Sequence, residues 1–496
     1  MKERTLTVLA DIDESRLDDL KARLADIDRR LAANDFPAFA EVETLHFASF
    51  VILEFPEGPP GLVFEANFDG DTEAFVKAVT GSAAGRDALG DVFSHCGGCP
   101  EDPDRLGPFL LEKNIGANCY YTGCTGRTAR QVRQEIELRT AVRRAVDSMP
   151  LRAGGADPAP AAIRAAVRRS IDDAGMDFWR RPFLVRHGQD IVHGLWRAFR
   201  WLLRIYAVVV VAALVVLALL TLKYGWLAVF NGEALGDLGN RLDDTWNLAL
   251  CLILAGIAVA LIAVVVLIIP LIVFLIRLRR RERTDSEFKD AWDSIYREEV
   301  VAREFGRENI QNHFCSLTRV KPGRFRLRTL RLILWGINLA GRLYWNRGKL
   351  GEIPTIHFAR WVIIPRDGAH WLLFLTNYGD NWDSYLNDFI DRASNGVTAV
   401  WSNTDVVWRT RPAGGGATPA WRGPEGFPRS RFLILEGSRN EQPFKNYARN
   451  SQSPTRAWYQ AYPSMTVRNV DENTAQREAL FAPADQADLH EWLRRV

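Results

Sequence analysis

The most informative pattern in the chain is a nine-residue apolar run that occurs twice. Residues 45–53 read LHFASFVIL, and residues 356–364 read IHFARWVII. Both runs are rich in β-branched and aromatic residues, which indicates strands. Each is followed by a second run of the same kind, at residues 62–68 and 372–378, and the turn-forming residues PEGPP precede the first of these. The two regions therefore predict equivalent pairs of neighbouring strands.

The likeness between the two regions extends further and indicates an internal duplication. Residues 41–53 and 352–364 align without gaps and are identical at seven of thirteen positions, including the His-Phe-Ala triplets that begin at His46 and His357. Further blocks match in the same order: 62–68 with 372–378, 92–96 with 400–404, and 120–142 with 458–480. A repeated order of several blocks is expected from a duplicated domain.

Helical patterns occupy equivalent places in the two copies. Apolar residues recur at helical spacing in residues 14–33 and again in residues 325–343, ahead of each strand pair. The resulting order, strand, helix, strand, strand, helix, strand, is the βαββαβ unit of ferredoxin-like folds. We therefore expect an α+β fold in which two such units, residues 1–148 and 307–496, pair their sheets as an α+β barrel.

The segment between the copies contains two long apolar runs. Residues 205–222 include no charged residue, and neither do residues 245–276. About 20 apolar residues are enough to cross the hydrocarbon core of a bilayer. The sequence therefore predicts a two-helix transmembrane hairpin at residues 205–276, with spans at about 205–225 and 247–276.

Arginines collect on both sides of this predicted hairpin, whereas its connecting loop is acidic. The positive-inside rule then predicts an inner (plasma) membrane protein with two spans and both termini in the cytoplasm. The preceding residues 149–204 read as a linker and an interfacial amphipathic helix, and residues 277–306 as a charged returning helix. The lipid bilayer is thus an expected partner, and small residues in the second span make a homo-oligomer an open alternative.

Composition adds little to this picture but excludes several function classes. The chain has 496 residues, and its formal net charge of +3 averages regions of very different charge. The arginine clusters flank the predicted spans, so nucleic-acid binding is not expected. The chain also lacks the glycine-rich nucleotide-binding motifs, HExxH and GxSxG, which excludes several common enzyme mechanisms.

The tandem ferredoxin-like plan resembles the dimeric α+β barrel superfamily, which includes dye-decolourising peroxidases and chlorite dismutases. The strings IHFARW, LLFLTNY and YLNDFID are also similar to a bacterial membrane-protein family with no assigned chemistry. The first resemblance implies a haem-peroxidase-like oxidoreductase acting on a membrane-proximal substrate. The peroxidase motif GxxDG has no match, the nearest strings being NFDGD at Asn67 and NYGDN at Asn377. The alternatives are a non-catalytic ligand-binding or scaffold protein at the membrane, or an oligomeric membrane assembly.

Four residues of copy two are candidates for catalysis. His357 opens the second strand, Asn377 ends the third, and His313 lies at the start of the first. Arg360 stands where copy one has Ser49, so a guanidinium is present in one copy alone. His313, His357 and Arg360 are also the candidates for binding haem. A structural role for the two histidines, at the starts of strands, is the competing interpretation.

The cysteines raise a separate metal hypothesis. Cys96 and Cys99 form a C-x2-C pair, and Cys119 and Cys124 follow within 29 residues of Cys96. Such a set is typical of a tetrahedral zinc site. Reduced thiols are the competing interpretation.

Copy two also contains an insertion, residues 404–431, that copy one lacks at that length. It is rich in Gly and Pro and includes Trp408 and Trp421. It is expected to form a lid, a partner-binding loop or a surface decoration.

Overall fold

The structure is a computed structural model. It describes residues 3–123, 125–149, 160–180, 200, 204, 269–305, 310–343, 350, 353–411, 418–481 and 491–492. The chain divides into two compact units, one formed by Met1–Gly188 with Ser286–Val496 and the other by Gln189–Asp285. The candidate site described below lies within the first unit.

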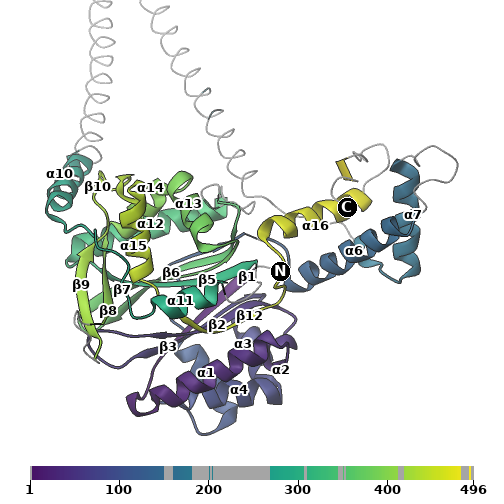
Figure 1. The fold of residues 1–496 in the computed structure, drawn as a ribbon, viewed down its shortest axis with the longest axis horizontal. Helices are drawn as coiled ribbons and strands as arrows, with labels where there is room; N and C mark the ends of the chain where they lie inside the picture. Colours follow the sequence, from purple (N-terminus) through teal and green to yellow (C-terminus); the bar gives the residue numbers. More distant parts are fainter. Residues whose placement is uncertain are drawn as a thin grey trace, which may run out of the picture. The chain divides into compact units, whose positions relative to one another are not determined.

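Two antiparallel sheets dominate the first unit (Figure 1). The four-stranded sheet has the order β1 (Glu3–Asp11), β3 (Gly61–Asp69), β2 (Leu45–Leu53), β12 (Thr455–Gln460). The six-stranded sheet has the order β4 (Cys119–Thr122), β6 (Ile356–Arg366), β7 (Ala369–Gly379), β5 (Gln311–Val320), β8 (Thr404–Thr410), β9 (Ala420–Gly426). The short strands β10 (Ser430–Arg431) and β11 (Leu435–Glu436) pair separately.

Helices connect the strands of each copy. Those of copy one are α1 (Leu17–Ala32), α2 (Pro37–Ala40), α3 (Thr72–Gly81), α4 (Ala83–Phe93), α5 (Leu106–Glu112) and α6 (Ala129–Asp147). Helix α7 (Pro160–Asp173) follows copy one. Those of the later part are α10 (Ile269–Thr284), α11 (Arg297–Phe305), α12 (Arg324–Leu343), α13 (Trp382–Asp391), α14 (Ser394–Trp401), α15 (Glu441–Asn450) and α16 (Val467–Phe481). Short 3-10 turns lie at Glu14–Arg16, Pro103–Arg105, Phe178–Arg180 and Gly437–Arg439.

Each copy places its last strand in the sheet of the other copy. β4 of copy one pairs with β6 of copy two, and β12 of copy two pairs with β2 of copy one. The registers are equivalent, since Tyr121 lies opposite Ala359 and Tyr459 lies opposite Ala48. The two copies are therefore interlocked by a reciprocal exchange of strands, and neither sheet belongs to one copy alone.

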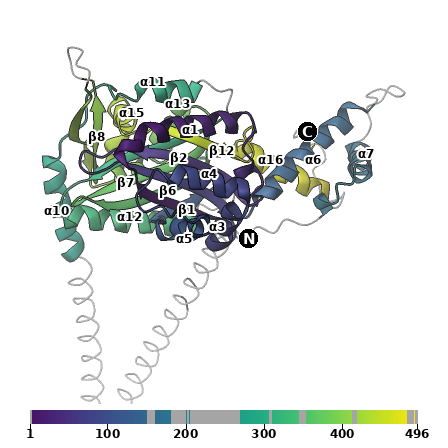
Figure 2. The same ribbon diagram turned by 90° about the horizontal axis from the view of Figure 1, so that it is seen from below.

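The sheets stack face to face, with helices on their outer faces (Figures 1 and 2). Between the sheets, apolar side chains of β2 and β3 form one buried cluster with those of β5, β6 and β7. Helices α1–α5 cover the outer face of the four-stranded sheet, and α12–α15 cover that of the six-stranded sheet. Because β2 and β3 are buried on both faces along their whole length, they read as continuous apolar runs rather than as alternating patterns.

The expected transmembrane hairpin is a wrong prediction. Among the described residues, none of the helices is both long and apolar enough to cross a membrane. Helix α10, which overlaps the end of the second predicted span, has 16 residues. Its C-terminal half carries Arg277, Arg279, Arg280, Arg281 and Arg283. At 1.5 Å per residue it is about 24 Å long, short of a hydrocarbon core of about 30 Å. The predicted inner-membrane localisation with two spans is therefore also wrong, because it rested on the hairpin.

Most of the predicted hairpin falls on residues that the structure does not describe. Residues 205–268 lie outside the described residues, and this range contains the whole of the first predicted span and most of the second. The predicted returning helix, residues 277–306, corresponds to the end of α10 and to α11, with non-helical residues between them.

The Gly/Pro-rich insertion extends the larger sheet. Its two ends form β8 and β9, which pair antiparallel and bury Trp408 in the core of copy two. Trp421 on β9 is 36% exposed. Residues 412–417, at the tip, lie outside the described residues.

Candidate functional site

Equivalent strand registers show where the two copies differ. β1 pairs with β3 as β5 pairs with β7, and β2 faces β12 as β6 faces β4. Matching these registers identifies three polar residues whose counterparts have another character: His313 in place of Thr5, Arg360 in place of Ser49, and Glu65 in place of Leu375. The two copies therefore differ at these three positions between the sheets. Of the three differences, the one at Arg360 is the one that the sequence comparison also identifies.

These residues meet at Glu65, whose buried carboxylate accepts five hydrogen bonds. The donors are Asn67 Nδ2 at 2.8 Å, Asn377 Nδ2 at 3.0 Å and Arg360 Nη2 at 3.1 Å to Oε1, with His313 Nε2 at 2.8 Å and Ser49 Oγ at 3.2 Å to Oε2. Burial raises the pKa of Glu65, but Arg360 and His313 outweigh burial and hold that pKa well below its ordinary value. Glu65 is therefore an ionised carboxylate whose acceptor capacity is filled.

Arg360 of copy two donates hydrogen bonds to strands β1 and β3 of copy one. Its Nη1 donates to Leu6 O at 2.6 Å and to Thr7 Oγ1 at 3.0 Å, both on β1. Its Nη2 donates to Glu65, to Ala66 O at 3.1 Å and to Asn67 Oδ1, all on β3. The guanidinium is thus fully engaged with protein acceptors and acts as a cross-link between the sheets.

His313 connects this buried network to the surface. Its Nδ1 lies 2.7 Å from Thr455 Oγ1 on the exchanged strand β12, while its Nε2 faces Glu65. The ring of Trp458 lies beside it, with ring centroids 6.1 Å apart, and donates its indole N–H to Asn377 at 2.8 Å. The sequence-predicted residues His313, Asn377 and Arg360 therefore belong to one network, whereas His357 does not.

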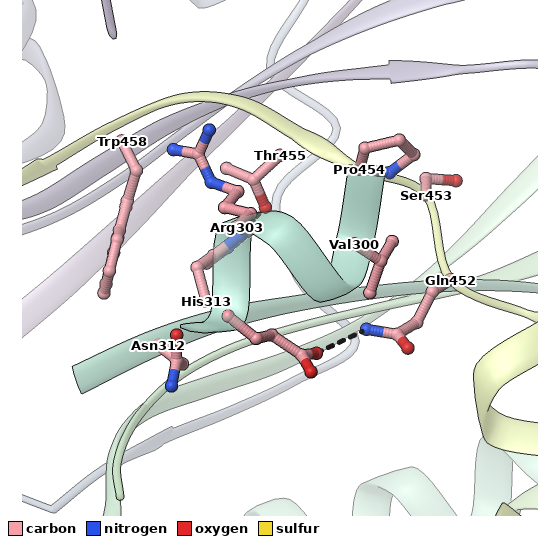
Figure 3. A pocket seen from close by; sticks show the side chains of 10 residues that line it. Val300, Arg303, Asn312, His313, Gln452, Ser453, Pro454, Thr455 and Trp458 are labelled. Carbon is pink, nitrogen blue, oxygen red and sulfur yellow. Dashed lines mark hydrogen bonds between the residues drawn. The ribbon is translucent and has the colours of Figure 1, made fainter. Parts of the chain in front are cut away.

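A pocket opens above His313 (Figure 3). Trp458 stands on one side and Gln452 on the other, with His313 and Arg303 between them. Residues from α11, β5, β12 and the turn after α15 line it: Val300, Arg303, Glu304, Asn312, His313, Gln452, Ser453, Pro454, Thr455 and Trp458. Its enclosed volume is about 20 Å³, which holds one water-sized group.

Glu304 is the unusual member of the pocket lining. Its side chain is 8% exposed, and Oε1 accepts from Arg449 at 2.6 Å and from Gln452 at 3.5 Å. The other oxygen, Oε2, is buried and has no hydrogen-bond partner among the described residues. Burial raises the pKa of Glu304, although Arg449 opposes it. The carboxylate that lines the pocket thus has one oxygen with unfilled hydrogen-bonding capacity.

The repeated histidines, His46 and His357, lie where the exchanged strands end. The backbone carbonyl of His46 accepts from Ala461 N at 2.9 Å, and that of His357 from Gly123 N at 2.7 Å. The His46 ring lies 3.1 Å from Asp69 Oδ1 and 2.8 Å from the Tyr462 hydroxyl. Their equivalent positions at the two crossings support the structural interpretation of this pair.

The environment of His357 disfavours its charged form. The side chain is fully buried, with its ring centroid 5.3 Å from that of Phe47 and 5.9 Å from that of Tyr462. Burial, with a contribution from His46, lowers the pKa of His357 to about 3. The imidazole is therefore neutral at neutral pH.

The residues proposed to bind haem do not fit that group. Ligand pockets typically measure about 300–1,000 Å³, whereas the cavity beside His313 encloses about 20 Å³. Both ring nitrogens of His313 already have polar partners, and Arg360 is committed to Glu65 and backbone carbonyls. Apolar side chains also fill the space between the sheets. Haem binding by these residues stays a prediction.

The described residues do not assemble the expected zinc site either. No group of three or more His, Cys, Asp and Glu side chains in the described part of the chain could hold a metal ion. Cys96 packs in the core of copy one with Cys99 against it, whereas Cys119 belongs to the core around the six-stranded sheet. Cys124 lies outside the described residues, so the four-cysteine set as a whole stays a prediction.

Sequence reasoning missed three residues of this region: Glu65, Glu304 and Trp458. A signal for Glu65 was present, because LVFEANF places one carboxylate in an apolar strand where copy two has Leu375. Trp458 lies in the block that matches Tyr120, and Glu304 lies in a charged helix that contains two other glutamates.

No known protein family, curated protein or solved structure shows a significant match to this chain.

Proposed function

We propose that the protein is a non-catalytic binding protein, and that the pocket above His313 receives a compact hydrogen-bond donor of a small ligand, best fitted by a primary ammonium group. The observation that carries this proposal is the Glu304 carboxylate, which lines the pocket and whose buried oxygen Oε2 lacks a donor among the described residues. A buried carboxylate oxygen without a donor costs roughly 1–3 kcal/mol or more. A ligand N–H would remove that cost.

The dimensions and lining of the pocket support this ligand class. A volume of about 20 Å³ admits an ammonium-sized group, while the rest of the ligand would lie at the open mouth. Trp458 offers an aromatic wall that favours a cation. Arg303 is paired with Asp28 at 2.8 Å, so its charge is largely balanced.

The polar groups beneath the pocket favour binding over catalysis. Glu65 already accepts five hydrogen bonds, and both ring nitrogens of His313 face protein partners. A general base needs a free acceptor within reach of the substrate proton. These groups instead hold the pocket floor in one geometry.

Calorimetric titration of the full chain with methylammonium and, separately, with acetate tests the proposal. We expect methylammonium to bind and acetate not to bind at the same concentrations. The variant Glu304→Gln should weaken methylammonium binding at least about tenfold, because it removes the charge-assisted hydrogen bond. Glu298→Gln, an exposed position on the same helix, should leave binding unchanged.

Two results would overturn the proposal. One is equal binding of methylammonium by Glu304→Gln and by the unchanged protein. The other is no detectable binding of methylammonium, or a preference for acetate. Circular dichroism of both variants checks that the fold is retained.

A further inference from the structure

The outer face of α12 carries a stripe of large apolar side chains. Leu332, Trp335 and Leu339 are 63%, 61% and 42% exposed, and their spacing of three and four residues places them on one side of the helix. The opposite side packs Leu330 and Leu334 against the six-stranded sheet. The helix is thus apolar on both sides, and one of its apolar sides faces away from the core.

Arginines border this stripe. Arg324, Arg328 and Arg331 are exposed, and α12 contains no Asp or Glu. None of the ion pairs within the described part of the chain includes these three side chains. The outer face of α12 therefore combines unpaired positive charge with exposed Leu and Trp.

We infer that this face of α12 docks onto the surface of an anionic lipid bilayer. Guanidinium groups pair with phosphate oxygens, and Trp and Leu side chains favour the zone between headgroups and acyl chains. A basic face gains about 1 kcal/mol for each Arg near an anionic leaflet. The contact is peripheral, with the helix lying in the interface plane, and no residue of α12 crosses the bilayer.

Charge complementarity decides between this occupant and a second copy of the chain. Two α12 faces brought together would place arginines against arginines, which opposes association. An anionic headgroup layer meets the same arginines favourably. This inference goes beyond the proposed binding pocket and does not depend on it.

The same chemistry recurs in the other unit of the chain. Considered by itself, α10 exposes Ile269, Leu271, Ile272, Val273 and Ile276 in its first half. Its second half is arginine-rich, with one buried acidic residue, Glu282. A second helix with exposed apolar residues followed by arginines supports a lipid surface as the kind of partner that such a helix binds.

A site-specific probe is needed because two helices carry this chemistry. A polarity-sensitive dye on Leu339→Cys should shift its emission to shorter wavelength when the full chain meets vesicles containing phosphatidylglycerol. The same dye on Asp18→Cys, exposed on α1, should not shift. Vesicles of phosphatidylcholine alone should give a much smaller shift, and added salt should reverse it.

Substitution of the arginines tests the electrostatic part. The triple variant Arg324→Gln, Arg328→Gln, Arg331→Gln should reduce the dye-detected vesicle affinity at least about tenfold. The inference is overturned if the Leu339→Cys dye stays unshifted on anionic vesicles, or if the triple variant responds like the parent. A dye shift with an acidic helical peptide but none with vesicles would overturn it in favour of a protein partner.

Discussion

Replacing Arg360 by Met is expected to lower the free energy of unfolding by about 3–5 kcal/mol, because it leaves the ionised Glu65 carboxylate buried without its cationic partner. Arg360 also donates to Leu6 O, Ala66 O and Thr7 Oγ1, so these acceptors lose hydrogen bonds as well. Urea denaturation of Arg360→Met and the unchanged protein, followed by tryptophan fluorescence, measures the difference.

A double variant separates the unpaired charge from the lost packing. Copy two has Leu375 where copy one has Glu65, so Arg360→Met combined with Glu65→Leu makes the two sites more alike. The double variant should be more stable than Arg360→Met alone, because no uncompensated charge stays buried. Arg29→Met, a matched change at an exposed ion pair, should alter stability by no more than about 0.5 kcal/mol. A loss below about 1 kcal/mol for Arg360→Met would contradict the cross-linking role.

His357 is expected to make the protein less stable as the pH falls below about 6.5, its ordinary pKa in an unfolded chain. The folded-state pKa is about 3, so between these values the unfolded state binds a proton that the folded state excludes. Stability is therefore fully present above pH 6.5 and falls by about 1.4 kcal/mol for each pH unit below it. Unfolding free energies of the unchanged protein and of His357→Gln, measured from pH 7 to pH 5, test this slope.

The informative quantity is the difference between the two proteins in how the free energy of unfolding changes with pH. Between pH 7 and pH 5 the unchanged protein should lose about 2 kcal/mol more than His357→Gln, because other titrating groups contribute equally to both. Parallel curves would show that His357 accepts a proton in the folded state. His370→Gln, at a half-buried position that shares no core cluster with His357, is the matched control substitution.

The strand pairs of the fold could be predicted because the same apolar pattern occurs twice in the sequence. The matching apolar runs at 45–53 and 356–364 became β2 and β6, and the runs that follow became β3 and β7. The exchange of β4 and β12 was not predictable, since Tyr121 and Tyr459 suit either sheet edge equally well in sequence. The hairpin prediction was wrong because it rested mainly on the length of the apolar runs. The length of an apolar run does not determine how many of its residues form one helix.

The site was predictable in part for a related reason. Comparison of the copies singled out Arg360 against Ser49, and both side chains contact Glu65. The partner carboxylate was missed because pairing between sheets joins residues 295 positions apart. Glu304 could not be distinguished from Glu298 and Glu299, since burial by distant segments, rather than its own helix, sets it apart.

The reciprocal exchange of strands also bears on how such a chain could arise. A single ancestral copy could complete its sheet only by lending its last strand to an identical chain and receiving one in return. Joining two genes end to end would make that partnership permanent. The residues between the copies would then be released from any duty in the sheets, which leaves that junction free to acquire a sequence as unlike its flanks as the one found here.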